Sequence, residues 1–457
     1  MSEQLGTQQR PLRVAVVGAG PSGFYAAEAL FTSEMTVKVD MFDRLPSPFG
    51  LVRYGVAPDH YKIKNVIKIY EKIAARENFS FLGNVKVGKD ISAAELQTYY
   101  DAVIFSCGSE KEKTLGIPGE DLAGSYAASE FVWWYNGHPD CVNNKFDLSK
   151  EIAVVIGQGN VALDVARILC KTVDELKMTD ITQAALDALA QSKVREVHLI
   201  GRRGPAQTAF TPVEIREFGA LAECDVVVNP DELVLNDASK TELADPRNAP
   251  KKKNYDILGG FARMPIGKKR KRLIIHFYES PRELKGSGAV EKLVLEKNEL
   301  SGEPGKQKAK GTGKLKEMNC GVFFRSVGYR GAPIPGVPFR EDWAVLPNEG
   351  GRITDNGKPL SGLYCAGWIK RGPSGIIGTN KPCSQETAQN LLADVPNLPP
   401  CPQPDTNKVI EFLTKKGIKV VSFKDWQKID AAEIARGAKV GKPREKFLLV
   451  SEMLSVV

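Results

Sequence analysis

Hydrophobic and polar positions near the start of the chain follow the order strand, turn, helix, strand. Residues 12–17 (LRVAVV) form an almost wholly apolar run, which is typical of a buried parallel strand. The turn sequence GAGPSG occupies 18–23, and the small residues of 24–30 predict a closely packed helix. A second strand-like run at 36–42 ends at Asp43. This order predicts a βαβ unit.

The residue types in this unit fit a dinucleotide site. Gly18 allows a tight turn, Gly20 lets the backbone approach a pyrophosphate, and Gly23 lets the helix pack on the strand. The helix N-terminus presents N–H groups to the phosphates. Asp43 lies about 20 residues beyond the glycines, where an acid binds the ribose hydroxyls. The alternative is a purely structural βαβ unit, and the full context favours dinucleotide binding.

The same order recurs over 151–169 (EIAVVIGQGNVALDVARIL), with a second glycine turn. The strand that follows, 196–201, ends in Arg202 and Arg203 rather than in an acid. An acid would repel a 2′-phosphate, whereas guanidinium groups bind it through paired hydrogen bonds. The second site is therefore predicted to take NADP(H), and a solvated basic turn is the alternative. Two dinucleotide sites of different character indicate a flavoprotein, with FAD in the first.

These motifs predict an α/β fold with two Rossmann-like dinucleotide-binding domains, the NADP domain inserted into the FAD domain. The expected boundaries are 1–110 and 336–457 for the FAD-binding domain and 111–335 for the NADP-binding domain. Residues 236–271 are expected to be irregular and charged, and 290–295 to form a strand.

Composition narrows the possible chemistry. The 457 residues are 42% hydrophobic and 26% charged, with a formal net charge of +8 and no apolar run long enough for a membrane-spanning helix. The eight cysteines form no C-x-x-C pair, which argues against a zinc site, an iron–sulfur cluster and a redox dithiol. The histidines show no metal-ligand spacing, so no metal is predicted. Residues 1–12 have no targeting pattern, and a cytoplasmic location is expected.

Longer strings extend beyond the glycine motifs. They are PSPFGLVRYGVAPDH at 46–60, GQGNVALDVAR at 157–167, GRRGP at 201–205, GWIKRGPSGIIGTN at 367–380, FKDW at 423–426 and GKPREK at 441–446. On these strings the chain resembles the adrenodoxin reductase family, which includes bacterial ferredoxin–NADP reductases of the same type. The resemblance covers nearly the whole chain.

The resemblance implies roles for matched positions. The FAD residues would be Ser22, Asp43, Leu51, Val87, Trp368, Gly375, Ile376 and Ile377. The NADP residues would be Lys113, Gln158, Gly159, Asn160, Val161, Arg202, Arg203 and Glu214, with Gly375 also meeting the nicotinamide half. The family commonly has Glu in place of Asp43 and Arg in place of Lys113. A core tryptophan is the alternative reading of Trp368.

The resemblance also implies the activity of an FAD-dependent ferredoxin–NADP(+) reductase. NADPH would give a hydride to FAD, and single electrons would pass to a ferredoxin. His60, Asp164 and Glu217 would lie near the flavin, where we expect them to guide the nicotinamide and proton uptake. A structural role is the alternative for His60, as a turn residue, and for Asp164, at a helix N-terminus.

Basic runs at 251–253 and 268–272 predict steering of a small acidic ferredoxin. No nucleic-acid motif accompanies them, and neither nucleic-acid binding nor membrane insertion is expected. A dithiol reductase lacks its cysteine pair, and no string indicates a monooxygenase. An NADPH diaphorase or quinone reductase and a non-catalytic NADPH-binding flavoprotein remain as alternatives. The sequence does not predict the oligomeric state.

Overall fold

The computed structural model describes residues 4–457, which divide into two compact units. Unit 1 comprises the chain up to Val56, His60–Lys113 and Gly328–Val457, and unit 2 comprises Ala57–Asp59 and Thr114–Val327. Residues 1–3, which begin the stretch without a targeting pattern, lie outside the described residues. Within 4–457, none of the helices has both the length and the apolar character needed to cross a bilayer.

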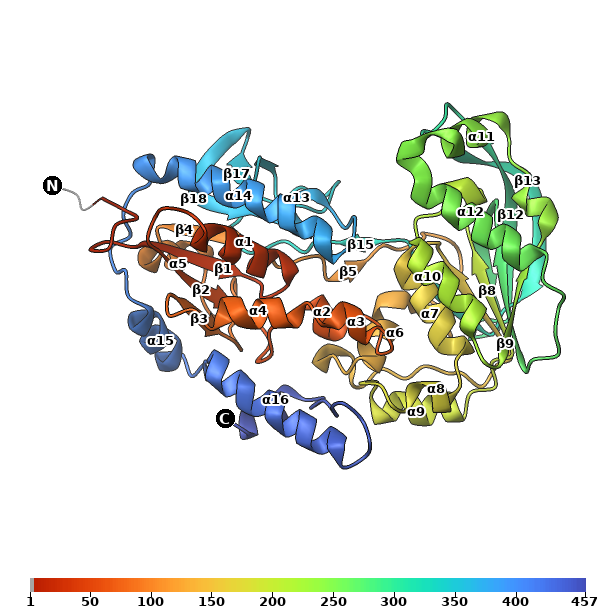
Figure 1. The fold of residues 1–457 in the computed structure, drawn as a ribbon, viewed down its shortest axis with the longest axis horizontal. Helices are drawn as coiled ribbons and strands as arrows, with labels where there is room; N and C mark the ends of the chain where they lie inside the picture. The colour runs from red at the N-terminus through yellow and green to blue at the C-terminus, as the bar shows by residue number, and fades with distance from the viewer. Residues whose placement is uncertain (1–3) are drawn as a thin grey trace. The chain divides into compact units, whose positions relative to one another are not determined.

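A seven-stranded sheet forms the centre of unit 1 (Figure 1), in the order β16-β17-β18-β4-β1-β2-β3. Strands β18, β4, β1, β2 and β3 are parallel, and β17 and β16 are antiparallel to their neighbours. The bounds are β1 Leu12–Val17, β2 Val37–Phe42, β3 Phe79–Leu82, β4 Ala102–Phe105, β16 Asn348–Glu349, β17 Arg352–Asp355 and β18 Lys358–Cys365. A separate pair joins β5 Lys111–Glu112 to β15 Tyr329–Arg330.

Helices cover both faces of this sheet. Helices α1 and α14 pack together on one face (Figure 1), where α4 and α16 also contribute apolar side chains to the same core. Side chains of α5 and α15 join the core on the other face. The bounds are α1 Pro21–Phe31, α2 Leu51–Tyr54, α3 Tyr61–Lys64, α4 Ile67–Ala74, α5 Ala93–Tyr99, α13 Trp368–Arg371, α14 Asn380–Asp394, α15 Thr406–Lys415, α16 Phe423–Ala438 and α17 Val450–Ser455.

Unit 2 contains a six-stranded parallel sheet, β6-β14-β7-β8-β10-β9, and an antiparallel sheet, β11-β12-β13. The strands are β6 Ser125–Ala127, β7 Ile152–Ile156, β8 Glu196–Ile200, β9 Cys224–Val228, β10 Lys271–His276, β11 Glu279–Lys285, β12 Lys292–Ser301, β13 Lys308–Asn319 and β14 Val322–Arg325. The helices are α6 Ala128–Tyr135, α7 Asn160–Cys170, α8 Val173–Leu176, α9 Gln183–Ala190, α10 Pro212–Glu217, α11 Asp237–Ala244 and α12 Ala249–Ala262. The predicted α/β class is confirmed.

The expectation of irregular structure over 236–271 is wrong. Helix α11 starts at a cap in which Asn236 Oδ1 accepts the N–H of Ser239 at 2.8 Å, and α12 follows with proline in its first turn. Lysine-rich α12 still buries Leu258 and Phe261, two positions three residues apart on one helix face. The strand expected at 290–295 is β12, which begins at Lys292 and ends at Ser301. The lysine-rich edge strand β13 was not predicted.

Candidate functional site

The first glycine turn joins β1 to α1 in unit 1, and each glycine meets a different constraint. Gly18 has φ +109°, and a Cβ there would lie 2.7 Å from the carbonyl oxygen of Ser106. A Cβ on Gly23 would overlap the carbonyl oxygen of Gly18, so this position brings the helix against the strand end. Gly20 faces open space, with no atom within 4 Å of the point that a Cβ would occupy. A ligand can therefore approach the protein backbone closely from this open side of the turn.

Helix α1 begins directly after Gly20, which gives it no side-chain cap. Its first N–H groups therefore have no partner from a capping side chain, and the positive end of the helix dipole faces the open side of the turn. Such an end accepts phosphate groups. The turn thus fits the pyrophosphate of FAD.

Asp43 follows the last residue of β2 and is tied to the same turn. Its Oδ2 accepts the N–H of Ala19 at 2.9 Å, and its Oδ1 accepts the N–H of Leu45 at 2.9 Å. Burial raises the pKa of Asp43 to about 6, although these two hydrogen bonds act in the opposite direction. Each oxygen keeps a lone pair that a ribose hydroxyl can use.

A second segment, residues 46–60, packs over the first glycine turn. The N–H of Phe49 donates to the carbonyl of Ala19 at 2.7 Å, with Phe49 at φ +82°, a rare conformation for a non-glycine residue. Gly50 follows, and its Cβ position lies 3.1 Å from the Cα of Gly20. Leu51, at the start of α2, is half-buried next to this contact. Val87 is also half-buried, in the loop after β3.

The C-terminal string 367–380 reaches the same turn. Gly367 has φ +74°, and a Cβ there would overlap the side chain of Ser22. Ser22 Oγ in turn lies 3.1 Å from Asn380 Oδ1. Trp368 is half-buried, and its indole N–H donates to the carbonyl of Ser374 at 3.3 Å. The ring of Trp368 also lies 5.5 Å from the ring of Tyr329, between centroids.

The other predicted residues of this string differ in exposure. Gly375 and Ile376 are exposed, with 56% of Ile376 accessible, whereas Ile377 packs against the core of unit 1. An exposed isoleucine next to a glycine-rich turn gives an apolar surface that a flat aromatic ring can cover. His60 is buried in unit 1 at the start of α3, and Lys113 is exposed in unit 1, where its N–H donates to the carbonyl of Gly328 at 2.9 Å.

Unit 2 repeats the construction of the first turn. Gly157 has φ +131°, and a Cβ there would overlap the carbonyl oxygen of Ser326. Gly159 faces open space and precedes α7, which has no side-chain cap. The amide of Gln158 donates to the carbonyl of His276 at 2.9 Å, and Asn160 Oδ1 accepts the N–H of Thr211 at 2.9 Å. These bonds hold the turn open for a pyrophosphate.

Val161, Arg202 and Arg203 are further predicted NADP residues of unit 2. Val161 is half-buried and packs on the core. Arg202 is exposed and Arg203 half-buried, and neither guanidinium forms an ion pair within residues 4–457. Burial, followed by the adjacent charge of Arg202, lowers the pKa of Arg203. Two neighbouring cations that form no ion pair within the described residues fit an anion such as a 2′-phosphate, with Glu242 the nearby acid that acts on Arg203.

A buried arginine that was not predicted as a site residue lies at the centre of a carboxylate cluster. Arg167, on α7, is fully buried and has 2.9 Å and 2.7 Å ion pairs with Asp59 and Asp164. Its Nη1 also lies 3.5 Å from Glu214 and 3.3 Å from Glu217. Glu214 thus faces Arg167, and no contact with Arg202 or Arg203 is found within the described chain.

Opposite charges within this cluster shift the pKa values of its members toward the ionised forms. Burial acts to raise the pKa of Asp59, but hydrogen bonds and charge from Arg167 and Lys171 hold it far below its usual range. Burial likewise acts to lower the pKa of Arg167, and the surrounding carboxylates outweigh it and raise the pKa. Arg167 stands in the string 157–167, three residues after Asp164, so helical spacing could have indicated this pair.

The cysteines form no disulfide bond within residues 4–457. All eight are free thiols in the described part of the chain. Cys170 and Cys224 are neighbouring thiols in unit 2, which the sequence did not indicate. Burial, and then the neighbouring thiol, raises the pKa of Cys170 well above its usual value, so the reactive thiolate is disfavoured.

Replacing Arg203 with Ala is expected to raise the KM for NADPH by about 10- to 100-fold, because a charge-assisted hydrogen bond contributes about 1.5–3 kcal/mol. Steady-state diaphorase assays with ferricyanide measure this change. The KM for NADH, which lacks the phosphate, should hardly move. Arg216→Ala, which removes another exposed arginine of unit 2, is the matched control. Equal losses for NADPH and NADH would contradict the assignment.

Affinity for FAD is expected to depend on the charge of Asp43. In the role predicted for it, the ionised carboxylate would accept ribose hydrogen bonds, and it becomes protonated as pH falls through about 6. The dissociation constant of FAD should therefore be constant above this pH and rise below it, by about tenfold at pH 5. Fluorescence of released flavin measures it. Asp43→Asn should bind FAD more weakly with a flat pH profile, and a flat wild-type profile would refute the role.

Comparison with known proteins places this site in a family. Residues 12–204 match the family described as pyridine nucleotide-disulphide oxidoreductase. The NADPH-ferredoxin reductase FprA of Mycobacterium tuberculosis is 45% identical over 98% of this chain and 99% of its own length. The mitochondrial NADPH:adrenodoxin oxidoreductase of Salvelinus fontinalis is 44% identical over 97% of this chain and 91% of its own length.

A solved structure agrees with these sequences. Mycobacterium tuberculosis FprA in complex with NADPH superposes with a TM-score of 0.90 at 44% identity, covering 98% of this chain and 99% of that one. The two Rossmann-like folds predicted from the glycine turns are thereby confirmed. This chain belongs to the adrenodoxin reductase family of NADPH-dependent ferredoxin oxidoreductases.

Proposed function

We propose that this protein is an FAD-dependent ferredoxin–NADP(+) reductase that oxidises NADPH and reduces a ferredoxin one electron at a time. The observation that carries the proposal is the pair of open, uncapped glycine turns, one tied to Asp43 and the other followed by unpaired Arg202 and Arg203. Full-length identity of 45% to an NADPH-ferredoxin reductase supports it. Bound FAD supplies the conversion between two-electron and one-electron transfer.

Unit 1 is the proposed FAD-binding domain. The open N–H groups of α1 bind the pyrophosphate, and Asp43 accepts hydrogen bonds from the ribose. Ser22, fixed by Gly367 and Asn380, holds the turn in position. The remaining contacts are proposed for Leu51, Val87, Trp368, Gly375, Ile376 and Ile377.

Unit 2 is the proposed NADP-binding domain, inserted between the two halves of unit 1 in the chain. Its second turn, Gln158 to Val161, binds the pyrophosphate of NADPH, and Arg202 and Arg203 bind the 2′-phosphate. We also propose that Lys113 and Glu214 contact NADPH. Because Glu214 lies against Arg167, we assign it to the neutral ribose region rather than to the phosphate.

His60, Asp164 and Glu217 are proposed to position the nicotinamide and to take part in proton uptake. Arg167 holds both carboxylates of unit 2 in place, at 2.7 Å from Asp164 and 3.3 Å from Glu217. The two ring nitrogens of His60 can donate or accept hydrogen bonds. Hydride transfer itself requires positioning rather than a nucleophile, so small displacements of these groups should appear in the rate.

The purified protein is expected to be yellow, and NADPH is expected to bleach it anaerobically without any added acceptor. Stopped-flow absorbance of the flavin band measures the rate. In His60→Gln, bleaching should slow by about 10- to 100-fold, because the nicotinamide is less well positioned. The variant should retain FAD and its affinity for NADPH.

The reductase function and the role of His60 would be contradicted by different results. A colourless protein that cannot be reconstituted with FAD would remove the reductase function itself. An unchanged rate of bleaching in His60→Gln would leave the reductase function intact and remove only the role of His60. Rapid reduction of quinones with no reduction of any ferredoxin would instead favour the diaphorase alternative.

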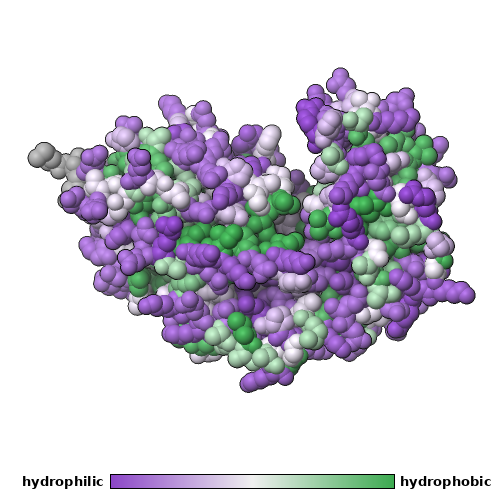
Figure 2. All heavy atoms as spheres, viewed as in Figure 1, coloured by the Kyte–Doolittle hydropathy of each residue, from purple (hydrophilic) through white to green (hydrophobic). Residues whose placement is uncertain are grey.

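The proposed partner is a small acidic ferredoxin that meets a basic surface of unit 2. Hydrophilic residues cover much of the visible face of the molecule (Figure 2). Several lysines of the two basic runs, however, already form ion pairs or hydrogen bonds within the protein. Lys251 pairs with Glu242 at 2.5 Å, and the ammonium groups of Lys269 and Lys271 donate to backbone carbonyls. Lys252 pairs with Asp256.

Three cations of these runs remain for steering. They are Lys253, Lys268 and Arg270, which are exposed and form no ion pair within residues 4–457. Exposed, unpaired charges act over about a Debye length and raise association rates with an oppositely charged protein. We therefore propose that fewer cations attract the ferredoxin than the two basic runs of the sequence indicated.

Reduction of cytochrome c through a ferredoxin is expected to fall steeply as ionic strength rises, because salt screens the steering charges. The double variant Lys268→Glu, Arg270→Glu should be slower at low salt and should flatten this dependence. Lys145→Glu, which reverses another exposed charge of unit 2, is the control. A wild-type rate that does not change with salt would count against electrostatic docking.

A further inference from the structure

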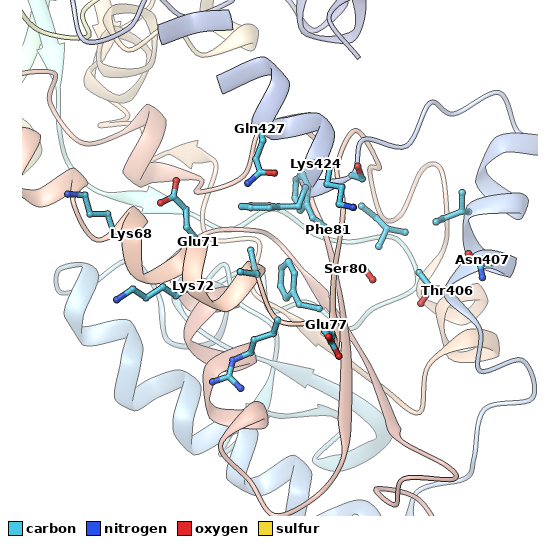
Figure 3. Close-up of a pocket in the computed structure, with 18 residues that line it drawn as sticks. Lys68, Glu71, Lys72, Glu77, Ser80, Phe81, Thr406, Asn407, Lys424 and Gln427 are labelled. Carbon is cyan, nitrogen blue, oxygen red and sulfur yellow. The ribbon is translucent and has the colours of Figure 1, made fainter. Parts of the chain in front are cut away.

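Two parts of the fold contribute no residue to the proposed FAD and NADPH sites. One is an open groove of about 1340 Å³ beside β3 in unit 1 (Figure 3). Glutamates and helix-capping aspartates offset the cations around it, and Phe81 of β3 is only 3% exposed, so its charge and shape indicate no particular ligand. The other is the antiparallel sheet β11-β12-β13 of unit 2, which contacts the segment that carries Arg202 and Arg203.

Two backbone hydrogen bonds join the arginine segment to the start of this sheet. The N–H of Glu279 donates to the carbonyl of Gly201 at 3.1 Å, and the N–H of Tyr278 donates to the carbonyl of Arg203 at 3.1 Å. Tyr278 has φ +62°, a costly conformation for a residue other than glycine. Its ring lies against Gly204, where a Cβ would be 2.5 Å from the tyrosine hydroxyl oxygen. The two segments are therefore closely packed at this point.

The carbonyl of Arg202, between these two, accepts its hydrogen bond from a side chain. The amide of Asn298, on β12, donates to this carbonyl at 2.9 Å and to Oγ of Ser280 at 2.8 Å. The N–H of Asn298 donates to the carbonyl of Tyr278 at 2.6 Å, and the residue is only 4% exposed. The amide group therefore has one fixed orientation. Any residue other than proline supplies a backbone N–H, whereas few side chains can supply this donor, so the identity of Asn298 matters here.

The carbonyl of Arg202 belongs to the peptide unit that joins the two arginines. Because a peptide unit is planar, fixing this carbonyl limits the directions in which both arginine side chains leave the backbone. A backbone held in one conformation also lowers the entropy that is lost when two flexible side chains bind one phosphate. Both arginines are free of ion pairs within residues 4–457, and the carboxylate of Glu242, which acts on Arg203 through its charge, is paired with Lys251 at 2.5 Å.

We propose that Asn298 is a positioning residue, which aligns Arg202 and Arg203 for the 2′-phosphate of NADPH and so sets the preference for NADPH over NADH. This role rests on the proposed function, in which the two arginines bind that phosphate. NADH has no phosphate at this position, so its binding does not use the aligned pair. The antiparallel sheet then supports nucleotide selection in addition to sharing an apolar core with the parallel sheet.

Isothermal titration calorimetry with 2′,5′-ADP and 5′-AMP measures the phosphate preference of the full-length protein without a redox step. The wild type should bind 2′,5′-ADP at least about tenfold more tightly than 5′-AMP. Asn298→Ala should bind 2′,5′-ADP about tenfold more weakly and 5′-AMP as the wild type does, because only the phosphate contacts lose their alignment. Asn298→Asp keeps the size but has no N–H donor, and it should lose the preference in the same way. A role in packing alone would leave Asn298→Asp close to the wild type.

Steady-state assays with ferricyanide should show the same separation. In Asn298→Ala the KM for NADPH should rise about tenfold, whereas kcat and the KM for NADH should stay within about twofold of the wild type, which also shows that the variant is folded. In a chain that already carries Arg202→Ala and Arg203→Ala, Asn298→Ala should weaken NADPH binding no further. The matched control is Asn136→Ala, which removes another buried asparagine of unit 2, whose amide donates to the carbonyl of Val132 at 3.1 Å. This control should keep the wild-type preference.

The results separate this role from the proposed function. A wild-type protein that binds 2′,5′-ADP and 5′-AMP equally would remove the assignment of Arg202 and Arg203 and, with it, the use of NADPH. A preference that survives in both Asn298 variants, or a loss that is equal for the two ligands, would overturn the role of Asn298 alone. If neither variant yields folded protein, Ser280→Ala, which removes one acceptor of the amide, should lower the preference about twofold. An unchanged preference in Ser280→Ala would then overturn the proposal.

Discussion

Both dinucleotide turns depend on one constraint. At certain glycines, another segment of the protein lies so close that a Cβ would not fit. In unit 1, Gly18 meets the backbone at Ser106, and Gly367 meets the side chain of Ser22. In unit 2, Gly157 meets the carbonyl of Ser326 in the same manner. Any larger residue would push the crossing segment away and move the helix N-terminus that faces the ligand. Positive φ at these glycines adds a second reason why other residues do not fit.

We propose that the two similar turns differ in specificity because of the residues that follow the neighbouring strands. Asp43 hydrogen-bonds back to the first turn and keeps lone pairs that hydroxyl groups can use, whereas Arg202 and Arg203 offer cationic donors that fit a phosphate. In both units these side chains lie at the C-terminal edge of a parallel sheet. The proposed difference between the two dinucleotides therefore rests on a few residues at that edge.

Buried charge is organised around single arginines in both units. Arg167 holds four carboxylates together in unit 2, and Arg53 ties α16 to the segment 46–60 in unit 1. Removing one partner of such a pair leaves a buried charge unsatisfied, which is strongly destabilising. The Arg167 cluster also fixes Asp164 and Glu217, so the same interaction supports folding and the proposed chemistry.

The sequence by itself determined both βαβ units and the α/β class, because glycine turns and apolar strands are local signals. It also placed Asp43 and the Arg202–Arg203 pair correctly at the ends of strands. The sequence did not indicate helices α11 and α12, because charged residues surround their few buried positions. It also did not indicate the edge strand β13, which has no buried residue. Only the tertiary structure brought Asp59 to Arg167 and joined lysines of the basic runs to carboxylates and backbone carbonyls. Asp59 and Arg167 stand 108 residues apart in the chain, and spacing along the sequence does not show that they meet.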